Sequence, residues 1–312
     1  MIEKVVEIGL PVDEHLVIVR HRLQPETLYG DEKRIAIVTG THGDELEGQY
    51  VCYLLNQIIG QQMEHLKGIV DIYPALNPMR IDSITRGIPM FDMDMNRIFP
   101  GDEYGATAEY VAAGIIKDLA GADLCIDIHS SNIFLRELPQ IRINEQSSEA
   151  LLPYAKLLNM DFIWIHSAAT VLEATLAYSL NQLHVPTLVV EMGVGMRIDQ
   201  QNGQQLVDGI LNLMKKMGVW SGPVRAPRRP IISSDGHVSF INAGQAGIFV
   251  PQVEYLDRVH RGDLVGAIVS PLTGEILQQL EAPCDGMIFT LREYPVVNQG
   301  SLIARILGGA VL

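Results

Sequence analysis

The sequence predicts an α/β protein with a mixed, mostly parallel sheet that carries helices on both faces, followed by a small all-β C-terminal domain. Short apolar, β-branched runs recur along the first two thirds of the chain, and stretches with helical periodicity separate them. After Trp220 the pattern changes to short strands and frequent turns. Alternating strands and helices are typical of α/β folds with right-handed crossovers.

Five short runs are the expected strands of the sheet. They are apolar on both faces and bounded by Gly, Pro, Asp or Ser, as expected for central strands that are covered on both sides. These runs are Ile35–Val38, Ile69–Tyr73, Leu124–Ile128, Phe162–Ile165 and Leu188–Val190.

The intervening stretches are the expected helices. Glu45–Ile59 places Leu46, Tyr50, Leu54, Leu55 and Ile58 at helical spacing, which predicts one apolar face. The other predicted helices are Ala106–Leu119, Ser148–Leu158, Leu172–Leu183 and Gln201–Met217.

A proline- and arginine-rich segment, Ser221–Pro230, is the predicted linker. Beyond it the turn sequences DGH, NAG, RGD, LTG, CDG and NQG indicate closely spaced short strands. We therefore predict a catalytic α/β domain over 1–222 and a β-rich domain over 223–312.

Composition excludes several classes of protein. Hydrophobic residues make up 47 % and charged residues 19 %, a globular balance that argues against disorder. A net charge of −14 opposes binding to nucleic acid, and no apolar run approaches the roughly 18 residues of a membrane helix. The N-terminus lacks the pattern of a signal peptide, so a cytoplasmic location is expected. Cys52, Cys125 and Cys284 are far apart in apolar contexts, which predicts core residues rather than disulfides or thiolate metal ligands.

Four polar side chains lie where predicted strands end. His42 and Glu45 follow the first run, His129 ends the third, and Glu191 ends the fifth. Ligands of open α/β sheets bind outside the carboxyl ends of the strands, so we expect these four at one edge. A catalytic zinc site uses three His or carboxylate ligands and leaves one position for water. We therefore predict one zinc ion per chain on His42, Glu45 and His129, with Glu191 as general base.

Each of these residues also has an ordinary structural explanation. A buried His is commonly a hydrogen-bonded core residue, Glu45 is favoured at a helix N-terminus, and Glu191 could belong to a salt bridge. The coincidence of all four at strand ends favours the metal site. Such a set also binds cobalt or manganese, and zinc is the expected ion among them.

A long irregular segment, 73–101, is rich in Arg, Asn and Asp, and such loops on α/β folds often carry binding groups. Arg86 and Arg97 could form bidentate pairs with a substrate carboxylate, with Asn96 beside them. Arg142 is a further candidate of this kind. The alternative is a structural network, for example arginines paired with Asp92 or Asp94.

Four motifs resemble the succinylglutamate desuccinylase/aspartoacylase family, which is related to the M14 zinc carboxypeptidases. GTHGDELEG resembles the family's HxxE zinc motif, FDMDMNRIFPG its DLNRxFPG segment, DIHSS its third-ligand motif and VEMG its catalytic-glutamate motif. The motifs occur in the family's order over roughly residues 30–200, and Met95 stands where Leu is usual.

The resemblance implies a zinc-bound α/β domain that hydrolyses N-acyl amino acids. It implies zinc on His42, Glu45 and His129, acid–base work by Glu191, a grip on the substrate carboxylate by Asn96 and Arg97, and assistance of the polarised carbonyl by Arg86. The tail EAPCDGMIFTLREYPVVNQGSLIARI resembles the barrel-sandwich hybrid of biotinyl and lipoyl domains. No lysine follows Ser270, which argues against a carrier role.

The predicted function is zinc-dependent hydrolysis of the amide bond of N-acyl amino acids or related N-acylated small molecules. One alternative is a zinc carboxypeptidase or peptide amidase on the same scaffold, and another is a non-catalytic, metal-containing binding protein. The expected partner is a small N-acylated substrate that carries a carboxylate. The sequence leaves open the acyl group and the choice between a monomer and a homo-oligomer.

Overall fold

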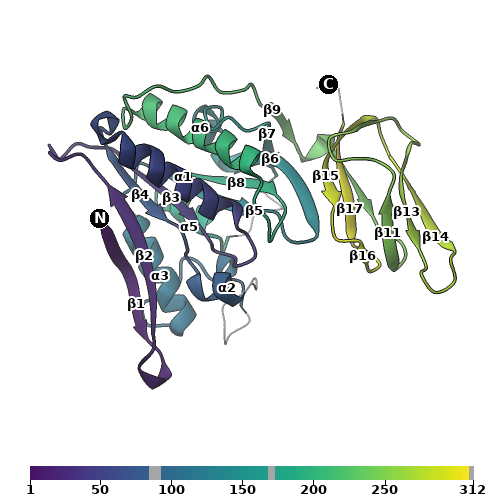
Figure 1. Ribbon diagram of the computed structural model, residues 1–312, viewed down its shortest axis with the longest axis horizontal. Coiled ribbons are helices and arrows are strands. Elements are labelled where there is room, and N and C mark those ends of the chain that lie inside the picture. The colour runs from purple at the N-terminus through teal and green to yellow at the C-terminus, as the bar shows by residue number, and fades with distance from the viewer. Residues whose placement is uncertain (84–92, 168–172, 309–312) are drawn as a thin grey trace.

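A single long mixed sheet organises the protein in the computed structural model, which describes residues 1–83, 93–167 and 173–308. Across the described residues the sheet has thirteen strands, with the main order β1-β2-β4-β3-β5-β8-β6-β15-β17-β10 (Figure 1). Its strands are β1 (Ile2–Gly9), β2 (His15–Leu23), β3 (Arg34–Thr39), β4 (Ile69–Tyr73), β5 (Leu124–Ser130), β6 (Leu135–Asn144), β7 (Phe162–His166), β8 (Thr187–Gly193), β9 (Ile231–Ser234), β10 (Val238–Asn242), β12 (Arg258–Val259), β15 (Gly286–Arg292) and β17 (Leu302–Gly308).

The centre of this sheet is parallel. Strands β4, β3, β5 and β8 run in the same direction, and β6 pairs antiparallel with β8. The predicted α/β class with a parallel core is therefore confirmed. The carboxyl ends of β3, β5 and β8 consequently meet at one edge of the sheet.

All five predicted strands are present, at β3, β4, β5, β7 and β8. Strands β1, β2 and β6 are not among the predicted strands. Strand β2 (HLVIVRHRL) and strand β6 (LRELPQIRIN) interleave charged residues with apolar ones, so neither reads as an apolar run. Those charges are accommodated because they pair with charges on neighbouring elements.

Helices cover both faces of the sheet. Core residues of α1 (Glu47–Gln61), α4 (Ser148–Ala155) and α6 (Gln200–Met217) pack in one cluster with one face, and those of α3 (Thr107–Leu119) and α5 (Leu176–Gln182) pack in a second cluster. A short helix, α2 (Pro78–Ser83), follows β4.

The face of α1 differs from the predicted one. The helix buries Val51, Cys52, Leu55 and Ile59, whereas Leu54 and Ile58 are only partly buried. The apolar residues of this stretch cover more than one face, so periodicity alone did not fix which of them face the sheet.

The C-terminal part has its own small antiparallel sheet, ordered β14-β13-β11-β16 and built from β11 (Gly247–Pro251), β13 (Leu264–Val269), β14 (Ile276–Glu281) and β16 (Val296–Val297). The predicted small all-β part is thus confirmed. It is joined to the α/β part through the main sheet, because β15 pairs antiparallel with β6. Figure 1 shows these strands at the end of the molecule opposite β1 and β2.

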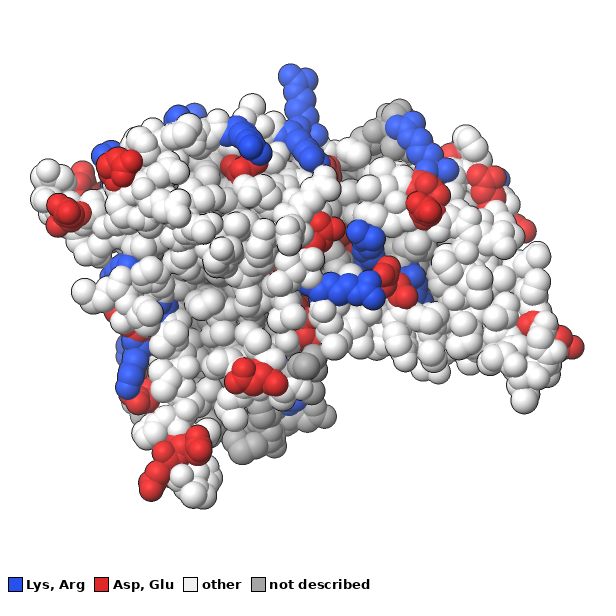
Figure 2. Space-filling model, viewed as in Figure 1, with Lys and Arg blue, Asp and Glu red and all other residues white. Residues whose placement is uncertain are grey.

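The surface carries charges of both signs. Figure 2 shows acidic and basic side chains scattered over one face, with a group of both signs where the α/β part meets the C-terminal strands. Within the described ranges, no helix combines the length and the apolar composition needed to cross a lipid bilayer.

Candidate active site

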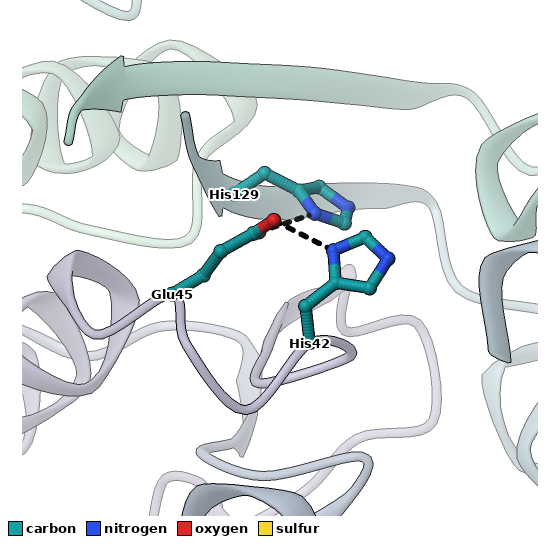
Figure 3. A group of neighbouring side chains, drawn as sticks. All are labelled: His42, Glu45 and His129. Carbon is teal, nitrogen blue, oxygen red and sulfur yellow. Dashed lines mark hydrogen bonds and ion pairs between the residues drawn. The ribbon is translucent and has the colours of Figure 1, made fainter. Parts of the chain in front are cut away.

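The three predicted metal ligands converge at the carboxyl edge of the sheet. His42 and Glu45 lie in the loop between β3 and α1, and His129 lies near the end of β5. Nδ1 of His42 is 2.7 Å from Glu45 Oε1, and Nδ1 of His129 is 2.9 Å from Glu45 Oε2. One ligand atom from each residue lies within 4.8 Å of the others, and all three side chains are buried. Figure 3 shows the two imidazoles turned toward the Glu45 carboxylate.

A close approach between β3 and α1 places this loop. A Cβ atom on Gly48 would lie 1.8 Å from Thr39 Oγ1, so only glycine allows the first turn of α1 to lie against the end of β3. The backbone N–H of Ser130 also donates to Glu45 Oε2 at 3.3 Å, which connects the loop to β5. The local sequence thus brings two ligands from one loop to the third ligand on the neighbouring strand.

Each histidine has a second carboxylate behind it. Nε2 of His42 donates to Asp94 Oδ1 at 2.9 Å, and Nε2 of His129 lies 3.1 Å from Asp127 Oδ1. Metal-bound histidines usually have this arrangement, because a carboxylate on the far nitrogen fixes the ring and increases its basicity. The Nδ1 atoms are therefore the nitrogens directed at the ligand position.

The electrostatics of the cluster favour a bound cation. Burial opposes charge on both histidines, but Asp94 and Glu45 raise the pKa of His42, and Asp127 and Glu45 raise the pKa of His129 well above its ordinary value. Burial also opposes ionisation of Glu45, yet His129 and His42 hold its pKa well below the usual range. A divalent ion satisfies the same carboxylates while it displaces the imidazole protons, so the donor set fits a metal.

Glu191 lies beside the candidate metal ligands, on the strand adjacent to that of His129. In the parallel pairing of β5 with β8, His129 and Glu191 are register partners. Burial raises the pKa of Glu191 to about 6, and nearby Glu137 adds to this effect, while Arg142 and His129 oppose it. Nη1 of Arg142 lies 3.2 Å from Glu191 Oε1. A carboxylate with such a pKa is suited to exchange protons near neutrality.

The described residues that were predicted to bind substrate come from two separate segments of the chain. Asn96 and Arg97 form a short 3-10 turn with Met95, where Asn96 Oδ1 accepts from the N–H of Leu176 at 2.9 Å and Arg97 is exposed. Arg142 lies in β6, with Nη1 on Glu191 and Nη2 on Glu137. Arg86 lies outside the described residues.

Arg142 is one of the residues that line a cavity of about 670 Å³, whereas His42, Glu45, His129 and Glu191 do not line it. Its walls come from β6, β7, β8 and α5 and from the C-terminal part, and include Trp164, His166, Asp235, Phe240 and Arg305. Burial and the nearby Arg142 lower the pKa of His166 to about 4, which keeps this imidazole neutral. The volume is that of a typical small-molecule site.

Three charged residues around the site, Asp127, Glu137 and Arg305, are not among the predicted site residues. Asp127 had a signal, because it is a charged residue inside the apolar run LCIDI. Glu137 and Arg305 had none, because charged residues in a strand are common.

Two tyrosines of the C-terminal part contact residues of the α/β part. Tyr255 lies under the guanidinium of Arg136, and Tyr294 packs against Phe134.

Comparisons with known proteins agree with this arrangement. The family model of the succinylglutamate desuccinylase/aspartoacylase catalytic domain matches residues 31–217. An N-alpha-acetyl-L-2,4-diaminobutyric acid deacetylase of Halomonas elongata is 24 % identical over 287 residues, which cover 89 % of this chain and 82 % of that protein.

Solved structures are similar over nearly the whole chain. A succinylglutamate desuccinylase/aspartoacylase from Rhodobacter sphaeroides superposes with a TM-score of 0.83 at 22 % identity, covering 98 % of this chain and 95 % of the other. The product-bound ectoine utilization protein EutE (DoeB) of Ruegeria pomeroyi also gives 0.83, at 19 % identity, covering 98 % and 93 %. These likenesses extend the shared fold into the C-terminal part.

The family match and the buried His-Glu-His cluster confirm the predicted class of enzyme, a deacylase that acts on linear amides of N-acylated amino acids. The chain belongs to the succinylglutamate desuccinylase/aspartoacylase family.

Proposed function

We propose that this protein is a zinc-dependent deacylase that releases the amine from small N-acyl amino acids with a free carboxylate. The observation that carries the proposal is the position of Glu191 on the strand next to His129, beside a buried cluster of two histidines and Glu45. This combination supplies three metal ligands and a separate carboxylate that is not itself a ligand in the proposal.

The proposed roles follow from the contacts. His42, Glu45 and His129 would hold the zinc ion, which when bound lowers the pKa of water and polarises the acyl carbonyl. Glu191 accepts the proton of the attacking water and returns it to the leaving nitrogen. Asp94 and Asp127 keep the two imidazoles oriented toward the ligand position.

For substrate recognition we propose Asn96 and Arg97 as the pair that holds the carboxylate, with Arg86 at the polarised oxygen. The exposure of Arg97 and the engagement of Asn96 Oδ1 by Leu176, which leaves the amide NH₂ as donor, support the first assignment. The terminal nitrogens of Arg142 are bonded to Glu191 and Glu137. We therefore propose that Arg142 contacts the substrate only at the place where the substrate reaches Glu191.

We also propose the cytoplasm as the compartment. The three cysteines are free thiols in the structure, two of them buried, which is typical of proteins in reducing compartments.

The test is release of free amine from a panel of N-acetyl, N-succinyl and longer N-acyl amino acids and from peptides with a free C-terminus. N-acetyl-2,4-diaminobutyrate belongs in the panel because the Halomonas relative is named for it. Each reaction is run with the metal-loaded protein, with the chelated protein, and after zinc is added back.

Chelator-sensitive release from N-acyl amino acids, restored by zinc, is the expected result. Release from peptides alone would replace the proposal with a carboxypeptidase. Bound metal with no release from any compound would favour the non-catalytic binding protein.

A further inference from the structure

Four charged side chains form a continuous chain from the C-terminal strands to Glu191. Arg305, on β17, donates through Nη1 to Glu137 Oε1. Glu137 Oε2 accepts from Nη2 of Arg142 at 2.7 Å, and Nη1 of the same guanidinium lies 3.2 Å from Glu191 Oε1. The chain thus links residue 305 to the proposed base through two residues of β6.

Glu137 is the centre of this chain. Its side chain is 2 % exposed. Burial opposes its ionisation, but Arg142 and Arg305 outweigh burial and lower the pKa of Glu137. A buried carboxylate without a cation is costly, so Glu137 requires at least one of the two guanidinium groups.

The charges in the chain balance when each residue is ionised. Arg305 and Arg142 supply two positive charges, and Glu137 and Glu191 supply two negative ones. The indole of Trp164 lies next to both guanidinium groups, with the central carbons of Arg142 and Arg305 at 5.7 and 5.4 Å from its ring centre. Since Arg305 satisfies one oxygen of Glu137, Arg142 is able to divide its two terminal nitrogens between Glu137 and Glu191.

We propose that Arg305 is a positioning residue for Glu191 and acts through Glu137 and Arg142. Loss of Arg305 leaves two carboxylates to share one guanidinium. The more deeply buried Glu137 then draws Arg142 away, and Glu191 loses the contact that fixes it beside the metal ligands. The C-terminal part therefore contributes to the reaction through this ion chain, and the inference rests on the proposed role of Glu191.

The principal variants are Arg305→Met and the double variant Arg305→Met/Glu137→Gln. For the single variant we expect kcat to fall about 10- to 100-fold, the range seen when a residue that orients a metal-site group is removed. Metal content stays unchanged, because Arg305 is not a proposed metal ligand. KM changes less than kcat, because Asn96 and Arg97, the proposed grip on the substrate carboxylate, are not part of the chain. The double variant removes the carboxylate that competes for Arg142, so it regains most of the lost kcat. Arg305→Lys keeps the charge and retains more activity than Arg305→Met.

The matched control is Arg197→Met. Arg197 also bridges the two parts of the protein, through a 2.7 Å contact of its Nη1 with Glu293 Oε1, but it is not a member of the chain. Arg197→Met therefore removes a contact between the two parts of the protein without breaking the link to Glu191. The kcat of this variant should equal that of wild type.

Wild-type kcat in Arg305→Met would overturn the inference, as would a double variant whose kcat is no higher than that of Arg305→Met. The Glu191→Gln variant separates this failure from failure of the proposed function. If Glu191→Gln keeps full turnover, the proposed base is wrong. If Glu191→Gln is inactive while Arg305→Met is normal, only the link from Arg305 fails.

Discussion

His129 and Glu191 are register partners on adjacent parallel strands, β5 and β8. Neighbouring strands lie about 4.8 Å apart, so the pairing alone fixes the proposed metal ligand His129 and the carboxylate of Glu191 side by side. Because both residues belong to strands and not to loops, the rest of the sheet holds their separation. This rigidity is what a site needs when one side chain binds a metal and the next one moves a proton.

Replacement of the proposed base tests the mechanism directly. Glu191→Gln keeps the shape of the side chain but removes its capacity to accept a proton, so turnover should fall by about 10²–10⁴-fold. Zinc content, measured by elemental analysis, should match wild type because Glu191 is not a proposed ligand. Wild-type turnover in this variant would contradict the role.

Asp127 should control metal affinity without touching the metal. Asp127→Asn removes the charge 3.1 Å from His129 Nε2 and should weaken zinc binding by about 10- to 100-fold, measured by competition with a chromogenic chelator. Asp123→Asn is the matched control, since Asp123 accepts from the N–H of Arg34 near the other end of β5. Equal affinity in the two variants would disprove the orienting role.

A second buried carboxylate, Asp71, should govern stability in acid. Its side chain is fully buried and accepts from Arg22 and Arg34 at 2.7 Å. Asp71→Asn should lower the free energy of unfolding by about 3–5 kcal/mol, because it removes the buried negative charge that pairs with the partly buried Arg22 and Arg34.

The pH dependence follows from the sign of the pKa shift. Burial opposes ionisation of Asp71, but Arg22 and Arg34 lower its pKa below the value of about 3.9 expected in the unfolded chain. The contribution of ionised Asp71 to the free energy of unfolding is therefore complete above about pH 3.9 and is lost as the pH falls through the pKa of the folded state. Urea unfolding at pH 7 and pH 3 should show a smaller difference between wild type and variant at the lower pH; a constant difference would contradict this.

His166 should destabilise the protein in mild acid. Burial and the nearby Arg142 and Arg305 lower its pKa to about 4, against the opposing influence of Asp235, whereas an unfolded histidine titrates near 6.5. As the pH falls from about 6.5 to 4, this histidine binds a proton in the unfolded chain but stays neutral in the folded protein. The free energy of unfolding therefore decreases by about 2–3 kcal/mol. In His166→Gln this part of the decrease between pH 7 and pH 5 should disappear from thermal unfolding curves. An unchanged pH profile would rule out His166 as its source.

Two helical glycines should respond in opposite ways to alanine. A Cβ on Gly209, in α6, would lie 1.9 Å from the carbonyl oxygen of Leu158, so Gly209→Ala must push two backbones apart. We expect a loss of at least about 2 kcal/mol in the free energy of unfolding, as for other overpacked sites. Gly60, in α1, has open space around the same atom, and Gly60→Ala should be neutral or stabilising by up to about 1 kcal/mol. Chemical denaturation of both variants distinguishes packing from helix propensity.

The sequence by itself determined the parallel core and the cluster of His42, Glu45 and His129. Apolar runs bounded by turn residues located the four parallel strands at the centre of the sheet, β4, β3, β5 and β8, together with β7. Strand ends of parallel sheets gather at one edge, so these three side chains could be brought together without coordinates. The spacing of His42 and Glu45 is local to one loop, and local chemistry is readable from local sequence.

Tertiary structure alone decided the partners of the charged residues. Arg142 looks the same in the sequence whether it meets a substrate or a carboxylate, and its contact with Glu191 follows from the antiparallel pairing of β6 with β8. The contact between Glu137 and Arg305 spans 168 positions. The ion-pair partner of such a residue can be identified only once strands distant in the chain are known to be neighbours. Coulomb attraction depends on distance in space, and it leaves no periodic signal in the sequence.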